Sequence, residues 1–268
     1  MNKINLLSKM CQLVLIILCT VFFTLILLGC SNGDDLVPVY TGPAPDLYWS
    51  FDDETIEDST VHDVTINDYN GTMNSGVADG EEGIAGEAVV FDGATGIING
   101  DLPKTNTFTV SVWINPASFP TAGDVREVAV NLGNGLGTWE GWLVSVRHTE
   151  TIGFCVEGGG GVSNEKRVVT QSGVPLGEWT HIVGTMSSSA EEIRIYCNGV
   201  FQESLSLGFK TINFGTVDLV LGLHSFFENY YFDGALDELA IFNDKVLSDK
   251  DIKSLYAVGH AGQPIVSP

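Results

Sequence analysis

From residue 47 onward, apolar and polar residues alternate in short runs that are typical of β-strands. In the run 107–116, four apolar side chains share one face of the expected strand, and mainly threonine and serine share the other. The pair Asn198–Gly199 joins two such runs and is the strongest hairpin signal in the chain. The pattern predicts strands at 47–53, 86–93, 107–116, 126–133, 141–149, 151–158, 177–188, 191–205 and 216–225.

One long stretch interrupts this pattern. Residues 54–86 are polar and rich in glycine, so we expect a connection there with only a weak strand near Thr72. Many short strands at regular spacing predict an all-β fold, an antiparallel β-sandwich of the jelly-roll type. We expect a single domain over residues 47–260, followed by a tail at 261–268.

The last part of the chain predicts one more strand and one short helix. Alternating apolar residues at 236–241 form the strand. Ser248 lies three residues before Asp251, which is the spacing of a side-chain cap at a helix N-terminus. Apolar residues then recur at helical spacing, and Gly259 is placed to end the helix.

This closing segment resembles the end of laminin-G-like jelly-roll domains of the concanavalin A-like lectin/glucanase superfamily. Their last strand and helix read roughly G-x-I/L-D-E-L/I/V-x-I/V/L-Y/F-N-x-x-L-S-x-x-E/D/Q-I. Further pieces of the chain match the family over most of residues 47–259. No single piece is specific to the family, but the order and spacing of the pieces are specific to it. The matching pieces are WSFDD, AVVFDG, TFTVSVWINP, WTHIVGT, IRIYCNG, LVLG and DGALDELAIF.

Residues 1–29 have the pattern of a signal peptide. Lys3 and Lys9 give a basic start, and an almost wholly apolar run extends from Cys11 to Leu28. The pair Gly29–Cys30, where this run stops, resembles a bacterial lipobox, in which the cysteine is lipidated and becomes the mature N-terminus. A single transmembrane anchor is the alternative, because about 18 apolar residues approach the minimum span.

Residues 30–46 contain three prolines and little periodicity, so we expect the lipidated Cys30 to be followed by a flexible tether. Ser31 resembles the outer-membrane class of lipoproteins. The pair Asp34–Asp35 resembles acidic signals that export some lipoproteins to the cell surface. We therefore expect a lipid-anchored outer-membrane protein that contacts the membrane through its lipid alone.

The charge of the chain is strongly acidic, with 34 Asp and Glu against 12 Lys and Arg. This balance excludes nucleic acid as a partner, because no basic stripe is present to neutralise phosphates. Most of the acidic residues are expected to form a soluble, self-repelling surface. The remainder leave room for a divalent-cation site.

The resemblance implies a structural calcium ion between the first and last strands, because many members of the superfamily bind one there. Asp52 ends the first strand, and Asp237 begins the last. Together with Asp92 they would supply carboxylates, and loop carbonyls would complete the 6 to 8 oxygens that calcium prefers. The alternative is that these aspartates only cap turns.

Two cysteines, Cys155 and Cys197, remain after the signal segment and the lipidated position. In an oxidising compartment an even pair can form a disulfide. The strand phases argue for two thiols instead, because Cys197 should point into the core and Cys155 away from it. Both readings stay open at the level of sequence.

Aromatic residues in loops are the candidates for ligand contact, because exposed aromatic rings stack on sugars and also form protein interfaces. The cluster HSFFENYYF lies between two expected strands, and a further tryptophan lies in a glycine-rich loop. We expect Phe232 to be buried beside the last strand. The candidates are Trp139, Phe226, Phe227, Tyr230 and Tyr231.

Catalysis is not expected. Glucanases of this superfamily carry an E-x-D-x-x-E strand with two carboxylates about 5 Å apart, and this run is absent. The histidines show no metal-ligand spacing, and His181 is expected in the core. We therefore predict a surface-displayed binding module for glycan or a surface protein. A structural subunit of an envelope assembly and a cryptic glycoside hydrolase are the alternatives, since the fold hosts all three.

Overall fold

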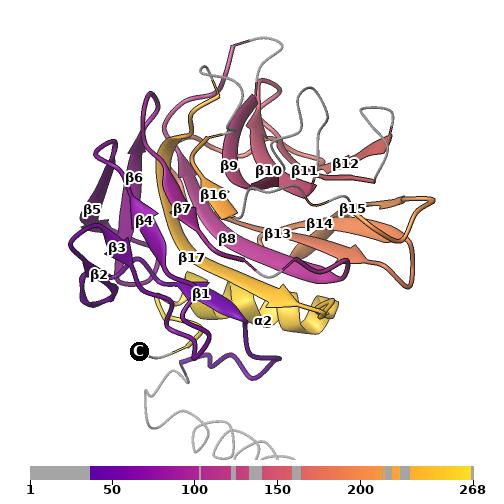
Figure 1. The fold of residues 1–268 in the computed structure, drawn as a ribbon, viewed down its shortest axis with the longest axis horizontal. Coiled ribbons are helices and arrows are strands. Elements are labelled where there is room, and N and C mark those ends of the chain that lie inside the picture. The colour runs from indigo at the N-terminus through magenta and orange to yellow at the C-terminus, as the bar shows by residue number, and fades with distance from the viewer. Residues whose placement is uncertain are drawn as a thin grey trace, which may run out of the picture. The chain divides into compact units, whose positions relative to one another are not determined.

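Strand β17 (Asp233–Asn243) lies inside the first of two antiparallel sheets in the computed structural model (Figure 1). It pairs with β8 (Phe108–Pro116) along one edge, and with β6 (Glu87–Asp92) and the first strand, β1 (Leu47–Trp49), along the other. The first and last strands are therefore neighbours, as the resemblance implied. The other strands of this sheet, sheet A, are β5 (Val77–Glu82), β13 (Thr180–Ser187), β14 (Glu192–Cys197) and β15 (Val200–Ser206).

The second sheet, sheet B, stacks against the first and has the order β12-β11-β10-β9-β16-β7-β4-β3-β2. All of its neighbouring strands are antiparallel. Its strands are β2 (Ile56–Glu57), β3 (Thr60–Val61), β4 (Gly71–Met73), β7 (Ile98–Gly100), β9 (Val125–Leu132), β10 (Gly141–Arg147), β11 (Ile152–Glu157), β12 (Glu165–Val169) and β16 (Leu219–Leu221).

The structure describes residues 37–266 apart from 103, 122–124, 133–140, 159–163, 213, 215–218 and 224–229. Pro38–Pro268 form one compact unit. Its folded part is longer at both ends than the sequence suggested. Tyr40, expected in the tether, packs edge-on against Phe242, and Ile265, expected in the tail, contacts the core beside the helix.

The main core lies between the two sheets, where the inward faces of the alternating strands meet. Trp49, Phe91 and Phe154 are among its largest fully buried side chains. A second, smaller core lies on the outer face of sheet A, where helix α2 (Asp249–His260) packs against the sheet (Figure 1). The predicted all-β sandwich with one C-terminal helix is therefore confirmed.

Helix α2 begins as the sequence predicted and ends later. Ser248 caps it in a capping box with Asp251. It continues past Gly259 to His260, and Gly262 beyond it takes a φ of 70°. Gly259 serves close packing instead, because a Cβ atom there would lie 2.5 Å from Nε1 of the buried Trp113.

The expectation for residues 54–86 was right for the weak strand near Thr72, which is β4, and wrong for the rest of the stretch. The stretch contains a single turn of 3-10 helix, η1 (Asp53–Thr55), and strands β2 to β5. Strands β7 and β12 were also missed. Most of these strands are only two or three residues long, and five of the six residues of β5 are exposed, so backbone pairing holds them without an apolar alternation.

Candidate functional site

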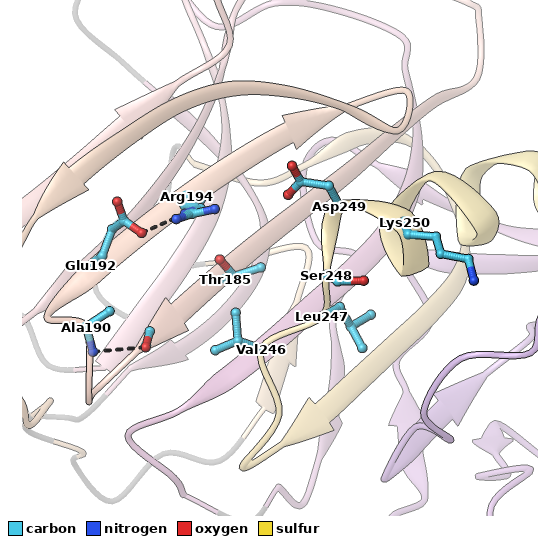
Figure 2. Close-up of a pocket in the computed structure, with 10 residues that line it drawn as sticks. Thr185, Ala190, Glu192, Arg194, Val246, Leu247, Ser248, Asp249 and Lys250 are labelled. Carbon is cyan, nitrogen blue, oxygen red and sulfur yellow. Dashed lines mark hydrogen bonds and ion pairs between the residues drawn. The ribbon is translucent and has the colours of Figure 1, made fainter.

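An open cleft lies on the outer face of sheet A, where α2 begins, and its volume is about 530 Å³. The helix covers the cross-strand pair Val183 and Tyr196. Two residues further along the strands, the pair Thr185 and Arg194 lies beyond the helix and faces the cleft. The lining residues are Thr185, Ser187, Ala190, Glu192, Arg194 and 246–250 (Figure 2).

Charged groups in the cleft are held in place by hydrogen bonds. Nε of Arg194 donates to Oε2 of Glu192 at 2.6 Å. Hydrogen bonding with Tyr196, followed by that with Glu192, raises the pKa of Arg194. The hydroxyl of Tyr196 also donates to Oδ1 of Asp249 at 2.9 Å, which ties the first turn of α2 to β14.

The apolar wall of the cleft is the segment before the helix. Thr109 anchors this segment, because its hydroxyl donates to the carbonyl of Lys245 at 3.0 Å and accepts from the N–H of Leu247 at 3.1 Å. Val246, between them, keeps 43% of its surface exposed. The cleft therefore combines an apolar wall with hydroxyls and charges of both signs (Figure 2).

A second group of charged side chains lies on the outer face of sheet B. Alternate residues of β10 point into the core, so Ser145 and Arg147 face outward. On β11 and β12 the outward positions include Gly153 and Arg167, which the register places near them. Nη2 of Arg167 lies 2.5 Å from Oε1 of Glu165.

Glu157 faces the same side and is 2% exposed. Burial, followed by repulsion from Glu165, raises the pKa of Glu157 to about 7. A hydrogen bond from the backbone of Asn164 acts in the opposite direction and lowers it. The adjoining cavity has a volume of about 10 Å³, which is roughly the space of one water molecule.

The three aspartates expected to bind calcium occupy two separate places. The carboxylate of Asp237 accepts the backbone N–H groups of Ile84, Ala85 and Glu238, at 2.7 to 3.1 Å. Asp52 accepts the N–H of Glu87 next to this loop.

Asp92 caps its own turn. It accepts the N–H groups of Ala94, Thr95 and Gly96, and these bonds together with the Thr95 hydroxyl outweigh partial burial and lower its pKa. Asp52, Asp92 and Asp237 therefore do not share one shell.

These carboxylates do not fit a calcium shell as they are bonded here. Calcium needs 6 to 8 oxygens that point at it, whereas both oxygens of Asp237 already accept N–H donors. In the part of the chain that the structure describes, no group of three or more His, Cys, Asp or Glu side chains is placed to ligate a metal. Calcium binding stays a prediction.

Residues 91–253 match the family model described as the concanavalin A-like lectin/glucanases superfamily. The chain belongs to this superfamily. A search of curated proteins found no match.

Solved structures of several binding domains are similar to this member of the superfamily. The binding domain of Paraclostridial Mosquitocidal Protein 1 has a TM-score of 0.63 at 16% identity, over 78% of this chain and 51% of that one. The botulinum neurotoxin serotype D binding domain has a TM-score of 0.59 at 16% identity, over 80% and 51%. The chain thus spans about half the length of these two domains.

A third structure is covered almost completely. Domain 4 of AbnA, a GH43 extracellular arabinanase from Geobacillus stearothermophilus, was solved in complex with arabinotriose. Its TM-score is 0.56 at 22% identity, over 78% of this chain and 97% of that one. At these identities the three likenesses show the sandwich fold that this superfamily member shares with them.

The aromatic candidates are only partly placed by the structure. Trp139, Phe226 and Phe227 lie outside the described residues, whereas Tyr230 and Tyr231 are partly buried. Phe232 is fully buried, as predicted. The outward-facing Trp113 is no sugar platform, because α2 covers it and Tyr256 stacks on it with ring centroids 5.6 Å apart.

The two cysteines of the domain are free thiols in the structure, so the disulfide alternative does not hold. The strand phases gave their directions correctly. Cys197 packs against the main core, and Cys155 lies on the outer face of sheet B. Burial raises the pKa of Cys155 to about 12 and that of Cys197 to about 11.

His181 lies in the core, as predicted, where its Nε2 is 2.8 Å from the hydroxyl of Ser111. Burial lowers the pKa of His181 to about 3, so its ring is neutral.

The sequence did not reveal the cleft or the convergence of Arg147 and Arg167 on sheet B. Strand alternation marks Arg147 and Arg194 as outward-facing, but only the strand order places them beside their neighbours.

Proposed function

We propose that this chain is a non-catalytic glycan-binding module that takes its ligand in the cleft beside α2. The observation that carries the proposal is the composition and size of that cleft. Its volume of about 530 Å³ falls in the usual range of ligand sites, roughly 300 to 1,000 Å³. A sugar ring offers hydroxyls to Glu192, Arg194 and Asp249, and its apolar face to Val246.

Two of the similar structures support a glycan as the ligand class. Domain 4 of the arabinanase was solved with arabinotriose, and a serotype D neurotoxin binding domain was solved with N-acetylneuraminic acid. These two ligands were bound by the arabinanase domain and the neurotoxin domain. For this chain they favour carbohydrate in general and leave its identity to experiment.

The absence of catalysis is part of the proposal. Glu157 and Glu165 face each other across β11 and β12, and a raised pKa suits an acid catalyst. The cavity between them, at about 10 Å³, is too small for a sugar ring. This geometry supports a binding role over hydrolysis.

Glycan binding is tested with the purified full-length protein on a glycan array, followed by titration of the best glycan. Arg194→Ala should reduce affinity by about tenfold or more, because it removes a charged donor from the cleft. Lys166→Ala, on β12, removes the same charge elsewhere and should leave affinity unchanged. Absence of binding on the array, or equal affinity of wild type and Arg194→Ala, would reject the proposal.

A structural or interaction subunit is a second candidate, and β15 is the observation that favours it. This strand forms one edge of sheet A and exposes Val200, Phe201 and Leu205 by 61%, 46% and 38%. Exposed apolar residues along a sheet edge are suited to protein contact. A partner retained by wild type and lost with Phe201→Lys would support this candidate.

The location of the protein is also proposed, as a lipoprotein of the outer membrane anchored at Cys30. It rests on the lipobox-like pair Gly29–Cys30 and on the apolar run before it. Among the described residues, no helix has both the length and the apolar character needed to cross a membrane. Residues 1–36 lie outside that search.

A further inference from the structure

Arg147 and Arg167 converge over Gly153 on the outer face of sheet B, the sheet that does not carry the cleft. A Cβ atom added to Gly153 would lie 3.4 Å from Cδ of Arg147 and 3.6 Å from Cδ of Arg167. It would also lie 3.4 Å from the hydroxyl oxygen of Ser145. The glycine therefore lets the two guanidinium stems and the hydroxyl pack together over the strand.

The two arginines are not fully compensated by the protein. Burial, followed by repulsion from Arg167, lowers the pKa of Arg147. Glu165 forms an ion pair with Arg167. Nη1 of Arg147 and Nε of Arg167 are buried and have no hydrogen-bond partner among the residues that the structure describes. Buried guanidinium donors without a partner cost free energy, which a bound anion would offset.

We propose that Arg147 and Arg167 form an anion-binding subsite for a single carboxylate or sulfate group. The planar guanidinium fork matches both groups and binds them through paired, charge-assisted hydrogen bonds. The hydroxyl of the buried Ser145 lies beside the same glycine, whose missing side chain lets the two arginine stems converge.

The ligand class is an acidic glycan with sparse charge. That it is a glycan rests on the proposed function. That its charge is sparse follows from the formal net charge of −22, because the field of such a protein repels long polyanions such as nucleic acid. One acidic sugar in an otherwise neutral oligosaccharide would be attracted by the nearby arginines more strongly than it is repelled by the distant carboxylates, because salt screens charges at long range.

The test is calorimetric titration of the full-length protein with two matched pairs of oligosaccharides. One pair is a uronate-containing oligosaccharide and its carboxyl-reduced form, and the other is a sulfated oligosaccharide and its desulfated form. Wild type should prefer at least one acidic member over its neutral partner by about tenfold or more. The two pairs distinguish a carboxylate from a sulfate ligand.

Arg147→Gln should remove that preference, and Arg147→Lys, which keeps the charge but not the fork, should restore part of it. Lys166→Gln removes one positive charge from the next position before Arg167 and should keep the preference. Circular dichroism and thermal melts verify that each variant is folded. No preference in either pair, or an unchanged preference in folded Arg147→Gln, would overturn the proposal.

The same titrations separate this inference from the cleft. Arg194→Gln should weaken binding at the cleft beside α2 for the acidic and neutral members alike, and it should leave the additional binding of the acidic member at the sheet B subsite unchanged. If Arg194→Gln has no effect while Arg147→Gln removes the acid preference, the cleft proposal fails and the anion subsite stands. If Arg194→Gln weakens binding and no acid preference exists, the reverse holds.

Discussion

The hydroxyl of Tyr48 donates a hydrogen bond to Oε1 of Glu238 at 2.5 Å and so joins the first strand to the last across a buried carboxylate pair. Glu238 is 3% exposed, and its neighbour Asp237 is fully buried. Burial raises the pKa of Asp237 to about 8 and, together with repulsion from Asp237, holds that of Glu238 well above its usual range. At neutral pH the folded pair therefore retains a proton that the unfolded chain loses.

This pair predicts that the protein is more stable in mild acid than in mild base. A carboxyl whose pKa is raised by folding stabilises the folded state fully below its unfolded pKa, and the contribution is lost as pH rises through the folded value. For Asp237 the window extends from its ordinary value of 3.8 to about 8, and for Glu238 it begins at 4.5. Within it, the free energy of unfolding should fall by about 1.4 kcal/mol per pH unit for each such group.

Glu238→Gln tests this slope, because it keeps the acceptor for Tyr48 and removes one titrating group. Its free energy of unfolding, measured by urea titration at several pH values, should depend less on pH than that of wild type. Glu54→Gln is the matched control, since Glu54 is exposed and the change in net charge is the same. Equal slopes for the two variants would show that general surface repulsion, and not this pair, sets the pH dependence.

The sequence was informative wherever a strand has one buried face. The alternation at 107–116 and the capping spacing of Ser248 and Asp251 gave β8 and the start of α2 nearly to the residue. It was uninformative for short paired strands such as β5, whose residues after Val77 are all exposed. Their position depends on backbone bonds to distant strands, which leave no local pattern.

The same limit applies to the candidate sites. Regular alternation along a strand would place Asp237 and Glu238 on opposite faces, but a bulge between Asp237 and Ala240 buries both side chains. Glu238 takes a φ of 52° there, in the left-handed region that non-glycine residues rarely adopt. The local sequence therefore does not predict this conformation. The convergence of Arg147 and Arg167 likewise depends on β12 joining β11, a strand that the alternation did not reveal.

Asp237→Ala separates the calcium prediction from a purely structural role. The hydrogen bonds lead us to expect a loss of about 3 kcal/mol, because two buried N–H donors and one partly buried donor lose their acceptor at roughly 1 to 3 kcal/mol each. The loss should be equal in calcium and in chelator, as measured by thermal melts. A wild-type melting temperature that rises with calcium, and a variant that shows no rise, would instead establish a calcium site.

Cys30→Ala tests the lipid anchor. The variant should lose labelling by a fatty-acid probe in cells and accumulate as unprocessed precursor, because the lipidated thiol and the cleavage signal are both removed. Cys19→Ala is the matched control, since it changes a cysteine inside the apolar run and should be labelled normally. Labelling that persists in Cys30→Ala would reject Cys30 as the lipidated residue, and a membrane-bound wild type without any labelling would favour a transmembrane anchor.

Gly259→Ala should destabilise the protein although alanine is the better helix former. Replacing a helical glycine by alanine contributes about 1 kcal/mol of intrinsic stability. At this position the added Cβ would lie 2.5 Å from Nε1 and 2.9 Å from Cε2 of Trp113, which is closer than such atoms approach in proteins. Overpacking of this kind typically costs 1 to 3 kcal/mol, so we expect a net loss of about 1 kcal/mol.

The measurement is the free energy of unfolding, with indole fluorescence as a second signal of the shifted tryptophan. Trp113 cannot retreat easily, because Tyr256 stacks on it and His181 lies beside it with ring centroids 5.0 Å apart. Lys253→Ala, at an exposed position of the same helix, should change stability by no more than about 0.5 kcal/mol. A Gly259→Ala variant more stable than wild type would mean that the helix shifts freely on sheet A. The second core would then be less tightly packed than its buried residues indicate.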